Sequence, residues 1–237
     1  MSKDALRERV WDHLDESGEA RFPFPPHGRI PNFAGADRAA DRLTATDAWR
    51  AAETVKANPD APQLPVRRAA LAAGKTVFVA VPRLADERPF RRLDPAEIPA
   101  SDHDDATTVS GISTYGEPAG PDLPHVDLVV SGSVLVTPDG ARVGKGEGYS
   151  DLEFALLGEF DAVDASTVAT TVHESQLRDV PVPTESHDVP LDLICTPERT
   201  VRVTDRATAR PTGIDWNALD DERVDEMPVF DRLHPDR

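Results

Sequence analysis

Short, unbroken apolar runs set the strongest limit on how this chain can fold. TVFVAVP at 76–82 and VDLVVSGSVLV at 126–136 have the length and β-branched content of strands that are buried on both faces. STVATTVH at 166–173 and LDLIC at 191–195 indicate two more strands, with an edge strand at 200–204. Helical patterns separate the strands. We therefore predict an α/β fold of three layers, α/β/α, with a mainly parallel central sheet.

The rest of the chain divides into helices, one long excursion and a tail. Apolar spacing and glycine stop signals predict helices over 3–16, 35–43, 45–54 and 65–73. Residues 83–124 are rich in Pro, Asp and Gly, which predicts an irregular excursion with one short helix. We predict one α/β domain over 1–204. Asp, Arg and Pro dominate 205–237, so we expect a loosely packed acidic C-terminal tail there.

The charge balance excludes two classes of partner. The chain has 26 Lys and Arg against 43 Asp and Glu, a formal net charge of −17. Nucleic-acid binding needs a basic stripe, and the sequence has none. No apolar run is long enough to span a membrane, and the charged start MSKDALRERV is unlike a secretory signal. We expect a cytoplasmic protein that is a monomer or a weak homo-oligomer.

Lysine is scarce among the cations, since only four residues are Lys: Lys3, Lys56, Lys75 and Lys145. An acidic surface poor in lysine is expected of a protein that stays soluble in high salt, where screening suppresses repulsion between carboxylates. A merely acidic cytosolic protein is the alternative. The single cysteine, Cys195, allows no internal disulfide and no thiolate metal site.

The segment Arg142-Val-Gly-Lys-Gly-Glu-Gly-Tyr-Ser-Asp151 is the sharpest local motif. Three alternating glycines let a backbone approach a ligand closely, and Ser150 with Glu153 predicts a capping box that starts a helix. A glycine loop that leads into a helix N-terminus binds phosphate through free N–H groups. Arg142 and Lys145 add positive charge. The alternative is a tight hairpin that uses glycine only for its geometry.

Carboxylates near this motif suggest a metal site. Asp151 lies in the first turn of the predicted helix, where it could hold Mg²⁺ that also binds phosphate oxygens. His187-Asp188 and Asp192, just before the strand at 191–195, supply candidates for a second ligand. Asp151 could equally be a simple helix N-terminal charge. Lys3, Arg7 and Arg29 are further basic candidates.

Taken in order, these marks resemble the 5-formyltetrahydrofolate cyclo-ligase family. The matching residues are Lys3, Leu6-Arg7, Gly74-Lys75, Pro82-Arg83, Asp127 to Val130, the Arg142–Asp151 motif, Gln176, Pro183 and His187-Asp188. The resemblance implies a Rossmann-like α/β fold and an enzyme that uses ATP and Mg²⁺ to convert 5-formyltetrahydrofolate to 5,10-methenyltetrahydrofolate, releasing ADP and phosphate.

The resemblance also implies roles for individual residues. Arg142 and Lys145 would be catalytic, and Asp151 and Asp188 would hold Mg²⁺. The ATP phosphates would contact Lys3, Arg7, Arg142, Gly144, Lys145, Gly146, Gly148 and Tyr149. A folate-contacting carboxylate is expected before Gly74-Lys75, where Glu53 and Asp60 are the candidates.

Several departures place the chain in a divergent branch of this family. The family's second Tyr after Gly-Tyr is Ser150 here, and RIPNF at 29–33 and NPDAPQ at 58–63 resemble the methenyltetrahydrofolate synthetase domain-containing and archaeal cyclo-ligase-like proteins. With the acidic composition, this resemblance suggests a halophilic archaeal source. Two alternatives stay open: the same phosphoryl transfer on a non-folate, thiamine-related substrate, or a non-catalytic protein that binds a nucleotide or metabolite.

Overall fold

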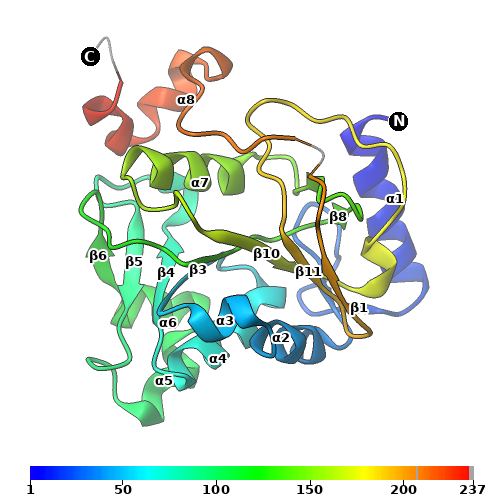
Figure 1. Cartoon of the computed structure of the whole chain (residues 1–237), viewed down its shortest axis with the longest axis horizontal. Helices are drawn as coiled ribbons and strands as arrows, with labels where there is room; N and C mark the ends of the chain where they lie inside the picture. The colour runs from blue at the N-terminus through cyan, green and yellow to red at the C-terminus, as the bar shows by residue number, and fades with distance from the viewer. Residues whose placement is uncertain (207, 235–237) are drawn as a thin grey trace.

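An eight-stranded mixed sheet forms the centre of the computed structural model, which describes residues 1–206 and 208–234 (Figure 1). The strand order is β12-β11-β10-β7-β3-β4-β5-β6. The five inner strands are mutually parallel: β3 (Thr54–Ala57), β4 (Thr76–Ala80), β7 (Leu128–Val130), β10 (Thr167–Thr171) and β11 (Leu193–Cys195). The outer strands are antiparallel to their neighbours: β5 (Phe90–Leu93), β6 (Glu117–Ala119) and β12 (Thr200–Arg202). The predicted α/β class and mainly parallel sheet are confirmed.

The parallel strands reverse their direction of progress at β3. From β3 the chain adds β4 on one side, then returns to add β7, β10 and β11 on the other side. In open α/β sheets, ligands bind beyond the carboxyl ends of the strands at such a reversal. The topology alone therefore points to the ends of β3 and β7.

Helices cover both faces of the sheet because successive strand residues point to opposite sides. In β4, Val77 and Val79 pack against one group of helices, and Phe78 packs against the other. The first group is α2 (Ala36–Thr44), α3 (Asp47–Ala51), α4 (Leu64–Ala72), α5 (His103–Ala106) and α6 (Val109–Tyr115). On the opposite face lies α7 (Tyr149–Glu159) (Figure 1).

The N-terminal helix lies beside the sheet rather than on one of its faces. Helix α1 (Lys3–Glu16) buries Leu6, Val10 and Leu14 against the hairpin of β8 (Leu135–Val136) and β9 (Arg142–Val143). A short ribbon of β1 (Ala20–Arg21) and β2 (Asn32–Phe33) follows it. Because β9 leads directly into the glycine-rich loop, α1 lies close to that loop.

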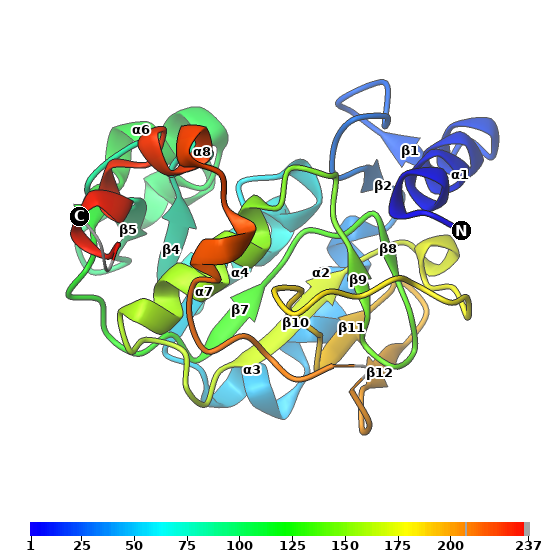
Figure 2. The ribbon, with the colours of Figure 1, turned by 90° about the horizontal axis from the view of Figure 1, so that it is seen from above.

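The segment after residue 205 packs against the core, so the expected loose tail is wrong for its described residues. Ile214, Val224, Met227 and Phe230 are buried and belong to the same apolar cluster as Phe154 of α7. Helix α8 (Asp221–Asp225) lies on the α7 side of the molecule (Figure 2). The segment thus covers one face of the sheet together with α7. Residues 235–237 of the predicted tail lie outside the described residues.

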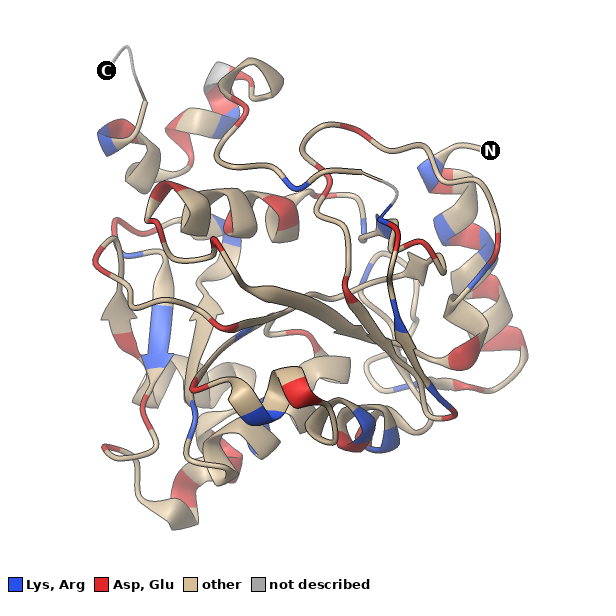
Figure 3. Ribbon diagram, in the orientation of Figure 1, with Lys and Arg blue, Asp and Glu red and all other residues tan. Residues whose placement is uncertain are grey.

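Two other expectations need correction. The predicted helix at 45–54 is only α3, and β3 begins at Thr54, because its residues pair on both sides with β4 and β7. The segment 83–124 contributes β5 and β6, which extend the sheet. Charged residues lie mainly on helices and connecting segments, and the inner strands are largely uncharged (Figure 3). No helix in the described part of the chain is long and apolar enough to cross a membrane.

Candidate functional site

A cavity lies beyond the carboxyl ends of β3, β4 and β7, at the reversal point of the sheet. Its volume is ≈ 300 Å³. Residues that line it follow each of the three strands: Asn58 to Asp60, Pro82-Arg83 and Gly132; the opposite wall comes from residues of 142–153. We call it the loop cavity. The glycine motif and the strand ends, which are far apart in sequence, therefore form one site.

The glycine loop, residues 144–148, takes backbone conformations that favour glycine. Gly146 has φ 113° and Gly148 has φ 71°. Gly148 is the N-cap of α7, so the helix begins at Tyr149, and the first-turn N–H groups have no intrahelical partner. Their partial positive charge favours a negative group at this end of α7. The motif is thus a loop leading into a helix, as predicted, rather than only a hairpin.

The predicted capping box is wrong. Helix α7 starts two residues earlier than the predicted Ser150 cap implies, and no side chain caps it. The Ser150 hydroxyl instead donates to Oδ1 of Asn58 (3.3 Å). The Glu153 carboxylate accepts from Lys56 and from Nδ2 of Asn58. Both side chains therefore face the strand ends.

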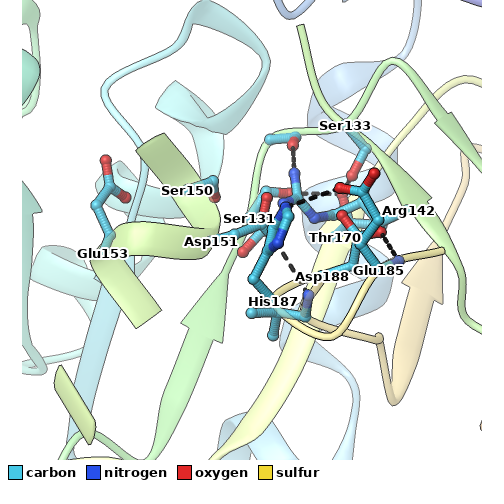
Figure 4. Close-up of polar contacts among 12 residues, drawn as sticks. Ser131, Ser133, Arg142, Ser150, Asp151, Glu153, Thr170, Glu185, His187 and Asp188 are labelled. Atoms are coloured by element: carbon cyan, nitrogen blue, oxygen red, sulfur yellow. Dashed lines mark hydrogen bonds and ion pairs between the residues drawn. The ribbon is translucent and has the colours of Figure 1, made fainter. Parts of the chain in front are cut away.

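The buried Arg142 and the partly buried Asp151 form an ion pair on the wall of the loop cavity (Figure 4). Nη2 of Arg142 lies 2.5 Å from Oδ1 of Asp151, and its Nη1 donates to the Gly132 carbonyl (2.9 Å). The Val189 N–H also donates to Oδ1 of Asp151 (3.0 Å). Among the described residues, Oδ2 of Asp151 receives no hydrogen bond. That oxygen is available to a metal ion.

Lys3 and Asp188 form a second pair beside the first. Nζ of Lys3 lies 2.9 and 2.7 Å from the two carboxylate oxygens of Asp188, and the Glu185 N–H also donates to Oδ2. Asp188 adjoins Val189, whose N–H contacts Asp151, so the two aspartates lie on neighbouring segments. Neither Lys3 nor Asp188 lines the loop cavity. Asp151 therefore fits Mg²⁺ as a single protein carboxylate whose remaining ligands are phosphate and water, whereas both oxygens of Asp188 are already engaged.

The remaining predicted cations contact the loop itself. Nε of Arg7 donates to the Gly144 carbonyl (2.7 Å), and Nζ of Lys145 lies 2.7 Å from Oε2 of Glu147. Lys145 and Tyr149 line the loop cavity, as Gly144 and Gly148 do. Arg7 and Gly146 do not, but a Cβ atom on Gly146 would lie 3.5 Å from the Arg7 guanidinium. The structure thus groups the predicted phosphate-binding residues other than Lys3 around one loop.

A buried polar network beneath the cavity was absent from the sequence prediction. Lys56 is 1% exposed and pairs with Glu153, which is 5% exposed. Asn58 joins them, and its Oδ1 also accepts from the Gly132 N–H (3.2 Å). This network fixes the ends of β3 and β7 to α7. The available signal is a lysine within the short apolar stretch TVKA, of which the predicted helix at 45–54 includes only Thr54.

Arg83 faces the same cavity from the end of β4. It is exposed, has φ 59°, and forms no ion pair or hydrogen bond within the described ranges. Leu84, with φ 55°, is fully buried and anchors this turn. Left-handed conformations of this kind are costly for residues other than glycine and concentrate at functional sites. Arg83 is thus a free cation at the cavity wall.

A second cavity, of ≈ 650 Å³, adjoins the loop cavity. The two share Ile30, Pro59, Asp60 and Ala80 to Pro82 as lining residues, and the second extends to Phe22, Arg29, Val109 and Ile112. Burial raises the pKa of the Asp60 carboxyl, and the nearby Lys145 opposes this shift. Glu53, the other sequence candidate, is exposed at the opposite end of β3. Asp60 alone of the two lies at the site.

Comparisons with known proteins identify the fold and the family. The NMR structure of 5,10-methenyltetrahydrofolate synthetase from Aquifex aeolicus has the same fold, with a TM-score of 0.55 and 18% identity over 89% of this chain and 97% of that one. The methenyltetrahydrofolate synthase domain-containing proteins of mouse and human are 41% and 37% identical over 98% of this chain. The chain spans 63% and 61% of their lengths. The model of the 5-formyltetrahydrofolate cyclo-ligase family matches residues 1–197, and the chain belongs to this family of enzymes.

Proposed function

We propose that this protein converts 5-formyltetrahydrofolate to 5,10-methenyltetrahydrofolate, with ATP becoming ADP and phosphate. The observation that carries the proposal is the placement of the cationic glycine loop and Asp151 at the sheet reversal, next to a second cavity large enough for another substrate. Family membership supplies the reaction type.

The reaction needs positioning and neutralisation of charge more than covalent work by the protein. The formyl oxygen attacks the γ-phosphorus, ADP leaves, and the formyl carbon becomes a phosphorylated imidate. The N10 amine then adds to that carbon, phosphate leaves, and N10 loses its proton. The two adjoining cavities suit this order of reaction steps, because the γ-phosphate of ATP and the formyl group of the folate must meet where the cavities share a wall.

The residues that line the loop cavity would have different roles in this reaction. The α7 N-terminus, Lys145 and the unpaired Arg83 would neutralise the phosphate oxygens. Arg142 holds the Asp151 carboxylate and the Gly132 carbonyl in place. Bound Mg²⁺, held by Asp151, would offset charge on the β- and γ-phosphates. Asp60, which lines both cavities, would contact the reduced folate.

A direct assay tests this function. Purified protein is incubated with 5-formyltetrahydrofolate and Mg-ATP in high salt, and the ultraviolet band of the methenyl product is followed together with ADP. We expect both products in equal amounts. ADP formed only with a different acceptor, such as a thiamine-related compound, would instead support phosphoryl transfer on a non-folate substrate. Binding without turnover of either compound would indicate a non-catalytic protein.

A further inference from the structure

Two arginines hold the glycine loop from outside the loop cavity. Arg7, on α1, donates to the carbonyl at the start of the loop, that of Gly144. Arg223, on α8, donates to the carbonyl near its end, that of Glu147. Arg223 lies beyond residues 1–197, the region that the family model matches. Its contact with the loop is therefore a feature that the family match does not cover.

The Arg223 side chain covers three consecutive residues where the loop enters α7. Besides its bond to Glu147, its guanidinium carbon lies 5.1 Å from the centroid of the Tyr149 ring. A Cβ atom built on Gly148 would lie 3.5 Å from Nη2 of Arg223. A guanidinium that both stacks on a ring and donates to a carbonyl fixes its partner in position and in orientation.

The element that carries Arg223 is itself anchored. Val224, next in sequence, is 4% exposed, and Met227 and Phe230 are fully buried in the cluster that includes α7. The Asp220 side chain accepts from the Arg223 N–H and caps α8. Arg223 therefore reaches the loop from a support that does not depend on the loop.

The loop needs such support because glycine loses more conformational freedom on ordering than any other residue. Gly144, Gly146 and Gly148 alternate through it. Between the last two lies Glu147, whose carboxylate holds Lys145. Holding the Glu147 carbonyl thus limits the positions from which its carboxylate can hold Lys145.

We propose that Arg223 is a positioning residue for the nucleotide. It orders residues 147–149, so that Lys145 and the first N–H groups of α7 meet the phosphates together. The C-terminal segment is then part of the ATP site, although it lines the loop cavity with no residue of its own. The inference rests on the proposed function, since it assumes that the loop binds ATP phosphates.

Measuring nucleotide binding without turnover distinguishes a positioning role of Arg223 from a contribution to overall stability. Binding of a fluorescent ATP analogue with Mg²⁺ is compared for the whole wild-type chain, Arg223→Ala, Arg223→Lys and the control Arg232→Ala. Arg232 lies in the same segment, with a side chain 62% exposed and a 3.8 Å pair to Glu87. We expect Arg223→Ala to weaken binding about tenfold or more, which corresponds to about 1.4 kcal/mol. Arg223→Lys should recover only part of the loss, because lysine lacks the planar fork.

Kinetics give a second, independent readout. Loss of Arg223 should raise KM for ATP while KM for the formyl substrate stays at the wild-type value. Arg223→Ala could melt well below the wild type. In that case Arg223→Gln, which keeps a donor for the carbonyl, replaces it in the comparison with the wild type and Arg232→Ala. ATP binding by the folded Arg223 variants equal to that of Arg232→Ala would overturn the inference alone. Failure of the wild type to bind Mg-ATP would overturn the proposed function, and the inference with it.

Discussion

At the scale of single residues, the site depends on charges that are already paired before a ligand arrives. Arg142 neutralises one oxygen of Asp151, and Lys56 neutralises Glu153 beneath the cavity. Asp60 and Arg83 line the same cavity, and neither forms an ion pair among the residues described. The pairs formed by Arg142 and by Lys56 shape the site, whereas Arg83 and Asp60 add charge at the cavity wall that no ion pair in the described part of the chain offsets.

Asp151→Asn should reduce kcat by about two orders of magnitude or more, because a neutral amide replaces the carboxylate that would hold Mg²⁺. Steady-state kinetics at several Mg²⁺ concentrations measure the effect, with Asp164→Asn, an exposed position after α7, as the matched control. Kinetics equal to those of the control would remove Asp151 from the metal site.

Asp60 makes stability depend on pH. Burial raises the pKa of this carboxyl, so the folded chain holds the proton more tightly than the unfolded chain. The stabilising contribution is present at low pH and is lost as pH rises from the unfolded-state pKa, about 3.9, towards the raised folded-state pKa. Asp60→Asn should therefore raise Tm at neutral pH more than at acidic pH, while lowering activity. Thermal melts across this pH range test it, and equal gains at every pH would contradict it.

The Lys56–Glu153 pair should be costly to break from one side. Lys56→Met leaves an unpaired buried carboxylate and is expected to destabilise the fold by about 3–5 kcal/mol. The double variant Lys56→Met with Glu153→Met removes both charges and should recover most of that loss. Urea unfolding measures both variants. A double variant no more stable than the single one would show that the pairing is not the source of the effect.

At the scale of elements, the sequence predicted correctly those helices and strands whose own residues carry a clear apolar pattern. The long apolar strand β4 and the amphipathic helix α1 each carry their own periodicity, and both are confirmed. Strand β3 was missed because its four residues include a lysine, whose burial depends on Glu153, 97 residues away. Strands β5 and β6 were missed because only pairing with β4 makes them part of the sheet.

The same limit applies to the candidate site. The glycine loop was found because its residues are consecutive, and its neighbours Arg142 and Asp151 belong to the same motif. The turn at Pro82-Arg83 was noted only through the family resemblance, and the covering Arg223 was not predicted. Their places at the site follow from strand order and from packing on α7, which no local pattern encodes.

Strand β11 supplies a probe for local opening. Burial raises the pKa of the Cys195 thiol to about 11, so the reactive thiolate is scarce at pH 8. Reaction with a disulfide reagent should be at least about a hundredfold slower in the native protein than in urea. Absorbance of the released thiolate measures both rates. Equal rates would mean that β11 and its edge strand β12 open freely.

At the scale of the whole molecule, the net charge of −17 produces repulsion that ions in the solvent can screen. The charged residues lie mainly outside the inner strands, so repulsion between them acts chiefly among helices and connecting segments (Figure 3). Screening shortens the Debye length from about 10 Å at 0.1 M salt to about 3 Å at 1 M. Adaptation to high salt, inferred from composition, stays a prediction.

Tm should rise steadily as KCl is increased from about 0.1 M to about 2 M, because screening reduces repulsion between carboxylates. Thermal melts in KCl measure the rise, and melts in sucrose at matched water activity separate charge screening from general exclusion effects. A Tm that is flat in KCl would favour an ordinary acidic protein over a halophilic one.

The hold of Arg7 and Arg223 on the glycine loop also bears on biosynthesis. Arg7 precedes Gly144 by 137 residues, so it has left the ribosome when the loop emerges. Arg223 follows Glu147 by 76 residues, which at about 5–20 residues per second delays its arrival by several seconds. During that interval the nascent chain can assemble β3, β4 and β7 while its phosphate loop is secured on one side only. Ribosome-bound chains should thus acquire a folded sheet before they acquire full affinity for nucleotide.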